Sequence, residues 1–220
     1  MHRLIVAAIL LAFPTARAGA QIFQVPRGSG PALWTSLSAG LHQLGDVEDG
    51  STASFWRFGT SVQYRASFEM DVANTGGFGG AIGYSDVDLA YYGGDVDGIP
   101  MCLGRCDAHV KVWTAMANFH MGGGTGFHQV FDIGLGAMFY RDFTRDSDGA
   151  SLPPLHGDTD VSLVVGGGFG YGFTPRLAIS LVQDAAYTLH QREGLSGDAR
   201  SHSQQYVTRI GLRYGLGSRR

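Results

Sequence analysis

The stretch WRFGTSVQYRASFEMDV, residues 56–72, decides the fold of this chain, because two kinds of side chain alternate along its whole length. The even positions carry mainly aromatic and aliphatic residues. The odd positions carry small, polar or charged ones, namely Arg57, Gly59, Ser61, Gln63, Arg65, Ser67, Glu69 and Asp71. A helix of 3.6-residue period cannot sort residues in this way, whereas a strand points successive side chains to opposite faces. The stretch is therefore predicted to be a β-strand.

The same alternation recurs along the rest of the chain and predicts seven further strands. Three segments alternate almost as cleanly: 131–140, 161–173 and 206–216. Four alternate more weakly: 33–43, 78–92, 109–121 and 176–190. In 78–92 and 109–121 the pattern leaves open which side chains face outward. The total of eight strands is an even number, as a closed antiparallel barrel requires.

The segments that connect the strands alternate between long and short. The longer ones lie near 44–54, 93–108, 143–160 and 191–203, and they are rich in Gly, Asp, Ser and Pro. The shorter ones lie near 73–77, 122–127 and 174–176. Transmembrane barrels have short turns on one side of the membrane and long loops on the other. We therefore expect an all-β fold, an eight-stranded antiparallel up-and-down transmembrane β-barrel, with its long loops outside.

The composition favours a membrane barrel over a water-soluble one, which would also alternate. The polar face of the predicted strands carries mostly Gly and Ser with isolated charges, and Lys111 is the only lysine of the sequence. Small residues and a few pairable charges suit a cramped barrel interior better than a solvated surface. Aromatic residues toward the strand ends are expected to form interfacial girdles, namely Trp34, Trp56, Tyr64, Phe68, Trp113, Phe139, Phe173 and Tyr214.

Residues 1–20 are predicted to be a cleaved export signal, which leaves residues 21–220 as a single barrel domain. A basic start is followed by the apolar run Leu4–Phe13, and Ala18-Gly19-Ala20 supplies small residues before a cut at Gln21. The run is too short to span a bilayer as a helix. A buried N-terminal helix is the alternative interpretation. Export together with a transmembrane barrel indicates an outer membrane.

The last predicted strand contains RIGLRYGL, residues 209–216, which resembles the C-terminal β-signal of outer-membrane proteins. Gly211, Tyr214 and Leu216 match its glycine, aromatic and terminal apolar positions. The resemblance implies recognition by the barrel-assembly machinery. It departs from the usual pattern at Leu216, where Phe is commonest, and in the four residues that follow. The alternating layout over 31–216 likewise resembles small barrels of the OmpA/OmpX type.

The interior of the predicted barrel is expected to hold a network of arginines and carboxylates. Its members are Arg57, Arg65, Glu69, Asp71, Asp132, Asp184, Arg209 and Arg213. A buried charge needs a partner, since leaving it unpaired costs several kcal/mol. We expect Asp132 and Asp184 to face Arg57, Arg209 or Arg213, with the glycines of 166–172 making room for the arginines. The alternative is a narrow, gated, charge-lined path.

Cys102 and Cys106 are the only cysteines of the chain, and Gly104 stands between them. In an exported protein two cysteines at this spacing are expected to form a small disulfide ring in the second long loop. A metal site that adds Asp107 and His109 is the alternative, but two cysteines and one histidine leave a zinc site short of ligands.

The sequence predicts no cofactor and no resident metal. Acidic residues of the long loops, such as Asp46, Glu48, Asp49 and Asp160, are expected to be solvated side chains facing lipopolysaccharide. The segment Asp146–Gly149 resembles a calcium loop but lacks the bidentate Glu.

The function expected from the sequence is structural or interactive, through membrane integrity or loop-mediated binding. A net charge of −3 gives no reason to expect nucleic acid as a partner. The expected partners are outer-membrane lipid, lipopolysaccharide and the assembly machinery, the chain is expected to be a monomer, and no extracellular partner is identified. One alternative is a narrow porin-like pathway for small or apolar solutes. The other is a lipid-modifying enzyme, although no His-any-Ser arrangement or other nucleophile motif occurs.

Overall fold

A computed structural model describes residues 30–72, 76–96, 99–190 and 202–217, in which every regular element is a β-strand. The strands are β1 (Leu33–Leu44), β2 (Val47–Asp49), β3 (Ser54–Phe58), β4 (Thr60–Val72), β5 (Gly76–Val96), β6 (Ile99–Met121), β7 (Gly126–Arg145), β8 (Asp158–Thr174), β9 (Leu177–Leu189) and β10 (His202–Leu216). The predicted export signal and its cleavage site lie outside the described residues. Within the described ranges there is no helix long and apolar enough to cross a membrane.

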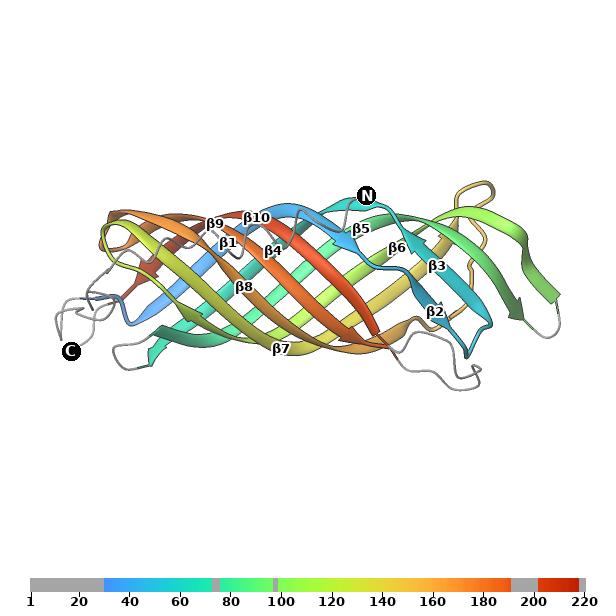
Figure 1. The fold of residues 1–220 in the computed structure, drawn as a ribbon, viewed down its shortest axis with the longest axis horizontal. Helices are drawn as coiled ribbons and strands as arrows, with labels where there is room; N and C mark the ends of the chain where they lie inside the picture. The colour runs from blue at the N-terminus through green and yellow to red at the C-terminus, as the bar shows by residue number, and fades with distance from the viewer. Residues whose placement is uncertain (1–29, 73–75, 97–98, 191–201, 218–220) are drawn as a thin grey trace, which may run out of the picture.

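The strands form a closed antiparallel barrel, as the sequence predicts. From β4 to β10 each strand pairs with the next along the chain, and β1 pairs with both β4 and β10, which closes the cylinder (Figure 1). Strands β3 and β4 occupy one position in the barrel, since both pair with β5, so eight positions surround the lumen. The short turns lie at the left end of Figure 1 and are called the proximal end here. The opposite end is the distal end.

Gly59 interrupts the long predicted strand and reverses the direction of its side chains. Gln63 on β4 is buried in the lumen, as expected, but on β3 it is Trp56 and Phe58 that point inward. Arg57 consequently points outward, with its side chain 59% exposed and its Nε 3.6 Å from Asp46. The prediction that Arg57 belongs to the lumen network is therefore wrong. An irregularity of this kind shifts the two-residue period by one position.

Strands β5 and β6 extend much further than the sequence predicts. The segment 93–108 was expected to be a long loop, yet β5 runs to Val96 and β6 begins at Ile99. The paired strands project beyond the rest of the barrel at the distal end (Figure 1). The structure also shows which side chains of these two strands face the lumen, which the sequence leaves open. Ser85 and Val87 point inward on β5, and Val110 and Val112 point inward on β6.

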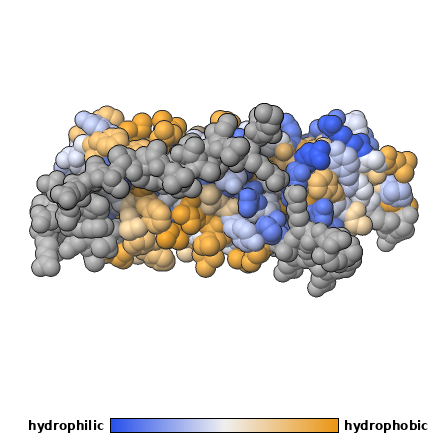
Figure 2. Space-filling view, viewed as in Figure 1, coloured by the Kyte–Doolittle hydropathy of each residue, from blue (hydrophilic) through white to orange (hydrophobic). Residues whose placement is uncertain are grey.

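Exposed apolar side chains form a belt around the proximal and middle parts of the barrel, and part of one face of this belt is visible in Figure 2. Its exposed side chains include Leu37, Leu41, Ile82, Ile133, Leu135, Leu163, Leu181, Ile210 and Leu212. On β8 the belt extends from Val161 to Phe173, which at about 3.3 Å per residue and a tilt of about 45° covers roughly 28 Å, the thickness of a bilayer core. This match supports the prediction that the apolar side faces lipid.

Aromatic residues mark both edges of the belt. Trp113 packs against Tyr84 at the distal edge, with ring centroids 4.6 Å apart, and Phe127 stacks on Phe169 toward the proximal edge. Two of the predicted girdle residues are placed otherwise, because Trp34 and Trp56 point into the lumen and are buried. Distal to the belt, the outer surface carries charged pairs such as Lys111–Asp142, 2.7 Å apart.

The distal half of the lumen has an apolar core that the sequence does not predict. Trp56 is fully buried there, with its ring centroid 4.6 Å from that of Phe143 and 5.6 Å from that of Tyr140. The connection between β7 and β8 folds into this end of the barrel. Its Leu152 is buried, and the Tyr91 hydroxyl donates a 2.9 Å hydrogen bond to the Pro153 carbonyl. Apolar packing therefore closes the distal half of the lumen.

Candidate functional site: the polar lumen

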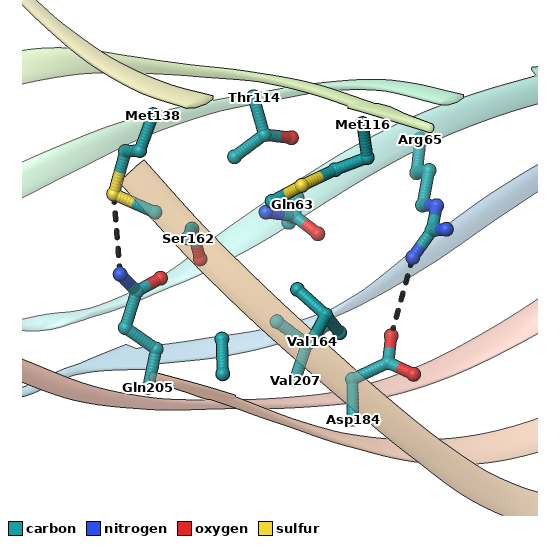
Figure 3. Close-up of a pocket in the computed structure, with 11 residues that line it drawn as sticks. Gln63, Arg65, Thr114, Met116, Met138, Ser162, Val164, Asp184, Gln205 and Val207 are labelled. Carbon is teal, nitrogen blue, oxygen red and sulfur yellow. Dashed lines mark hydrogen bonds and ion pairs between the residues drawn. The ribbon is translucent and has the colours of Figure 1, made fainter. Parts of the chain in front are cut away.

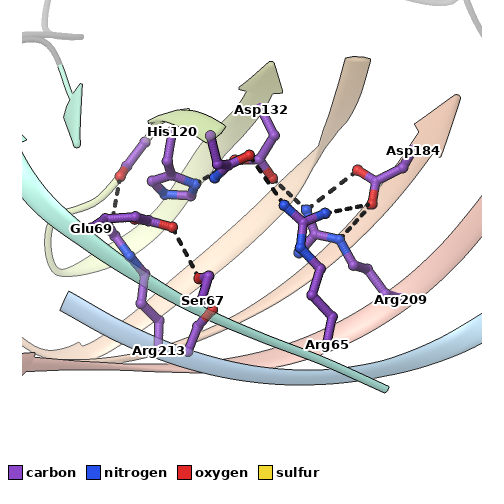
Figure 4. A network of polar contacts seen from close by, with 11 residues as sticks. Arg65, Ser67, Glu69, His120, Asp132, Asp184, Arg209 and Arg213 are labelled. Carbon is purple, nitrogen blue, oxygen red and sulfur yellow. Dashed lines mark hydrogen bonds and ion pairs between the residues drawn. The ribbon is translucent and has the colours of Figure 1, made fainter. Parts of the chain in front are cut away.

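Arg209 is the centre of the polar network in the proximal half of the lumen (Figure 4). It lies on β10, and its Nε donates to Asp184 Oδ2 at 2.6 Å. Its Nη2 donates to Asp132 Oδ2 and, at 3.3 Å, to Asp184 Oδ1. One guanidinium thus joins carboxylates from β7 and β9, with all three side chains nearly inaccessible to solvent. The fork of an arginine suits such bridging, since it presents several donors in a fixed plane.

Two further residues complete the hydrogen bonding around these carboxylates. Arg65 on β4 places Nη1 3.5 Å from Asp184 and donates through Nη2 to Asn118 at 3.1 Å. The Nδ1 of His120 lies 2.7 Å from Asp132 Oδ1. Both His120 and Asn118 come from β6, the strand whose lumen-facing side the sequence leaves open, so sequence analysis misses them.

A second group of contacts lies nearer the proximal end. Arg213 donates to Glu69 Oε2 at 2.7 Å, and Ser67 donates to Glu69 Oε1 at 3.2 Å (Figure 4). The guanidinium of Arg213 also lies over the ring of Trp34, with its Cζ 4.2 Å from the ring centroid. This cation–π contact accounts for the inward position of a tryptophan that was expected in the girdle.

The two groups balance their charges, because three arginines contact three carboxylates. Of the eight predicted network residues, the structure brings together six: Arg65, Glu69, Asp132, Asp184, Arg209 and Arg213. Arg57 lies outside the barrel, as described above. Asp71 lies at the proximal end of β4, opposite Gly77. Balanced pairing allows charge to remain inside a barrel of low dielectric.

A layer of neutral side chains lies beside the Arg65–Asp184 pair, and in Figure 3 it includes Gln63, Thr114, Ser162 and Gln205 together with the apolar Met116, Met138, Val164 and Val207. Gln205 donates to Thr188 at 2.7 Å, and its Oε1 lies 3.2 Å from His42 Nε2. Two cavities among these layers have volumes of about 30 and 20 Å³. Each has room for one or two water molecules. Neither is large enough to hold a solute.

The sequence predicts that the lumen glycines of β8 make room for arginines. In the structure these glycines have other neighbours. A Cβ at Gly166 would lie 2.1 Å from Asp184 Oδ1, and one at Gly170 would lie 2.4 Å from His128 Nε2. At Gly168 it would lie 2.0 Å from the backbone oxygen of Leu181. These glycines therefore accommodate a carboxylate, an imidazole and a neighbouring strand.

The structure contains the disulfide between Cys102 and Cys106, but it lies within strand β6 and not in a loop. Cys102 is paired with Gly93 and Cys106 with Tyr91, and the pairing register shifts between Tyr92 and Gly93. The extra residues bulge outward, and Leu103 is 94% exposed. The disulfide therefore closes a bulge at the base of the projecting hairpin.

The residues of the predicted assembly signal lie on the final strand, β10, which pairs with both β1 and β9. Tyr214 and Leu216 are exposed on the lipid-facing side. Gly211 points into the lumen, where a Cβ would approach Ser38 to 3.2 Å.

Two acidic residues that were expected in solvated loops are buried. Asp49 on β2 and Asp160 on β8 are each 1% exposed, and both lie near His190 at the distal end. Sequence analysis missed this arrangement because Asp49 lies in the segment 44–54, which was expected to be a long loop, whereas strand β2 forms there and turns Asp49 inward. The prediction of solvation is therefore wrong for these two residues.

Comparison with known proteins identifies the fold. No protein-family model and no curated protein sequence matches the chain. Among solved structures, Neisserial surface protein A (NspA) matches with a TM-score of 0.52 and 11% identity, over 84% of this chain and 97% of that one. This likeness shows the fold of a small eight-stranded outer-membrane barrel.

Two further structures match at lower similarity. Ail, the attachment invasion locus protein of Yersinia pestis, has 15% identity and a TM-score of 0.40 over 84% of this chain and 99% of that one. The outer membrane enzyme PagL has 13% identity and a TM-score of 0.35 over 82% and 99%. A fold by itself does not specify an activity, because one architecture can carry unrelated functions.

Proposed function

We propose that this protein is a non-conducting barrel of the outer membrane that anchors and presents its polar distal end at the cell surface. The observation that carries the proposal is the filled lumen. A charge-balanced network, a neutral polar layer and an apolar core follow one another along the barrel axis. An eight-stranded barrel is just wide enough for side chains to fill, and the two lumen cavities described above are small, with volumes of about 30 and 20 Å³.

The distal end supports the second half of the proposal, which is interaction. Beyond the apolar belt the hairpin β5–β6 projects, carrying the exposed side chains of Ile99 and Leu103 and the exposed pair Arg105–Asp107. Hydrophilic side chains dominate this end in Figure 2. Within the apolar belt the closed barrel leaves no free strand edge to pair with a second copy, which favours a monomer. Lipid and lipopolysaccharide are the proposed surroundings of the belt.

Single-channel recording in planar bilayers tests the closed lumen. The purified protein is expected to give no discrete conductance steps under conditions in which a general porin does. A matched variant, Trp56→Ala, removes the largest side chain of the distal core and is expected to remain closed, because the charged network persists below it. Reproducible steps from the wild-type protein, enlarged in Trp56→Ala, would replace this proposal with the narrow transport pathway.

The proposal includes no catalytic step. A deletion strain is expected to retain unchanged lipid A, as analysed by mass spectrometry of the extracted lipid. A change in lipid A acylation that the wild-type gene restores would instead favour a lipid-modifying enzyme.

The location and the assembly route are part of the same proposal. We infer that export removes residues 1–20, so N-terminal sequencing of the outer-membrane fraction should begin at Gln21. We also infer that the assembly machinery reads the last strand. Tyr214→Ser should lower the amount of heat-modifiable protein, whereas Tyr187→Ser, at a lipid-facing tyrosine of β9, should not. Equal loss in both variants would indicate lost lipid contact rather than a lost signal.

A further inference from the structure

A cluster of one imidazole and three carboxylates lies at the distal end of the lumen, apart from the network of Arg209. The Nδ1 of His190 lies 2.9 Å from Asp160 Oδ1 and 3.3 Å from Asp158 Oδ2. Its Nε2 lies 4.0 Å from Asp49 Oδ1. The cluster is distal to Val161 and Leu189, the last exposed apolar residues of β8 and β9, and therefore lies outside the membrane-spanning part.

The charges of this cluster do not balance within the part of the chain that the structure describes. Three carboxylates surround one imidazole, and no lysine or arginine of the described residues forms an ion pair with any of them. Arg141 approaches, but it donates to the backbone oxygen of Asp158. Buried charge without a counter-charge is costly, in contrast to the balanced network nearer the proximal end.

In the part of the chain that the structure describes, one nitrogen of this buried imidazole has no hydrogen-bond partner, and it faces the third carboxylate, that of Asp49. The side chain of His190 is 1% exposed, and its Nε2 has no hydrogen-bond partner among the described residues. The hydroxyl of Tyr140 is likewise buried, and it lies beside Asp160. Asp49, toward which Nε2 points, is held by donors from Ser51 and Thr52 and cannot rotate freely.

We propose that His190, Asp160 and Asp158 bind a divalent transition-metal ion of the Zn²⁺ class at the distal end of the barrel. Their donor atoms all lie within 4.8 Å of one another. Ligands about 2.0–2.1 Å from a tetrahedral ion are roughly 3.3 Å apart, close to the separations of His190 Nδ1 from the two carboxylates. One imidazole nitrogen and carboxylate oxygens are donors that Zn²⁺ accepts, and the nitrogen disfavours Ca²⁺ and Mg²⁺.

Asp49 and Asp158 have distinct roles in the proposed site. A proton on Nε2 of His190 would face Asp49, leaving the Nδ1 lone pair directed at the ion, as carboxylate partners of metal-bound histidines usually arrange. Asp49 is therefore a positioning residue. The side chain of Asp158 is 26% exposed, and it provides the route by which an ion enters from the external medium.

Zn²⁺ titration of the full mature protein tests the site. The protein is folded in detergent, treated with EDTA, dialysed and titrated by calorimetry, and Co²⁺ absorption in the visible range reports the coordination. We expect one Zn²⁺ per chain. His190→Gln should abolish binding, and Asp49→Asn should weaken it about 10- to 100-fold. His109→Gln is the matched control, because His109 forms an exposed pair with Asp146 at 2.8 Å and should leave binding unchanged.

The outcomes that contradict the site are equally specific. Absence of Zn²⁺ uptake by the wild-type protein, retained binding in His190→Gln, or Ca²⁺ binding of equal strength would each overturn the proposal. Heat-modifiable migration on gels verifies that every variant is folded. If His190→Gln does not fold, Asp158→Asn replaces it, since that side chain is partly exposed, and retained full affinity in this variant would likewise contradict the site. None of these measurements depends on whether the barrel conducts ions, so they test the metal site separately from the closed lumen.

Discussion

The guanidinium of Arg209 and the carboxylate of Asp184 face each other in a two-point contact, with nitrogen–oxygen distances of 2.6 and 3.3 Å, across the strand pair β9–β10. The contact is buried at the level where Asp132 joins from β7. Arg209 thus connects β10 both to the neighbouring strand β9 and, across the lumen, to β7. This connection is the strongest structural reason to regard the lumen as closed.

Removing Arg209 should therefore destabilise the barrel severely. Arg209→Met leaves Asp132 and part of Asp184 without their counter-charge, which costs about 3–5 kcal/mol in the free energy of unfolding. Urea unfolding in lipid vesicles, followed by gel migration, measures this change. The matched control is Arg57→Met, at the exposed arginine outside the barrel, where the loss should stay below about 1 kcal/mol. Similar losses in both variants would contradict the assignment of the two arginines to opposite sides.

Adjacent glycines of β8 offer a second test of the same network. In Gly166→Ala the new Cβ would lie 2.1 Å from Asp184 Oδ1, so the carboxylate must move away from Arg209. In Gly167→Ala the Cβ meets nothing within 4 Å. We expect the first variant to lose about 1–3 kcal/mol of stability and the second to remain within about 0.5 kcal/mol of the wild type. The order would be reversed if Gly167 faced the lumen.

The distal apolar core should contribute as much stability as a core in a soluble protein. Trp56→Ala removes a fully buried side chain and is expected to cost about 3–5 kcal/mol, measured by the same urea unfolding. Phe55→Ala, at the neighbouring outward position, should cost about 1 kcal/mol, because that ring contacts chiefly Tyr92. A larger loss of stability for Phe55→Ala than for Trp56→Ala would indicate that the odd positions of β3 face the lumen, as the sequence predicts.

The architecture could be predicted because two-residue alternation is a direct consequence of strand geometry. The sets of side chains that face lipid and lumen on β8 and β10 agree with the structure residue by residue, since no irregularity interrupts these strands between Val161 and Gly172 or between Tyr206 and Leu216.

The direction of the side chains on β3 could not be predicted, because it depends on a shift of one residue in the alternation. Gly59 interrupts the chain between β3 and β4, which both pair with β5. The side chains of β3 therefore face the opposite way from the prediction, so that Trp56 points inward and Arg57 points outward. Nothing in the local composition distinguishes a glycine at such a break from one within a strand. The burial of Asp160 and His190 could not be predicted either, because it depends on Asp49 and Trp56, which come from a distant hairpin.

Thiol labelling tests the bulge on β6. The unreduced, denatured protein should react with no maleimide, and the reduced protein should react at both Cys102 and Cys106. Because the bridge encloses a short segment of one strand beyond the apolar belt, Cys102→Ser/Cys106→Ser should keep heat-modifiable migration and lose only about 2 kcal/mol or less. Labelling of both cysteines without reductant would show that the bridge does not form.

Tryptophan quenching by brominated lipids tests most directly which side of the strands faces the membrane. The three tryptophans serve as probes, because Trp113 is 45% exposed at the distal edge of the belt, whereas Trp34 and Trp56 are buried in the lumen. Single-tryptophan proteins, with Phe at the other two positions, are reconstituted in vesicles with bromine along the acyl chains. Strong quenching of Trp113 with little quenching of Trp34 and Trp56 is the predicted result. Quenching of Trp34 or Trp56 as strong as that of Trp113 would contradict the account.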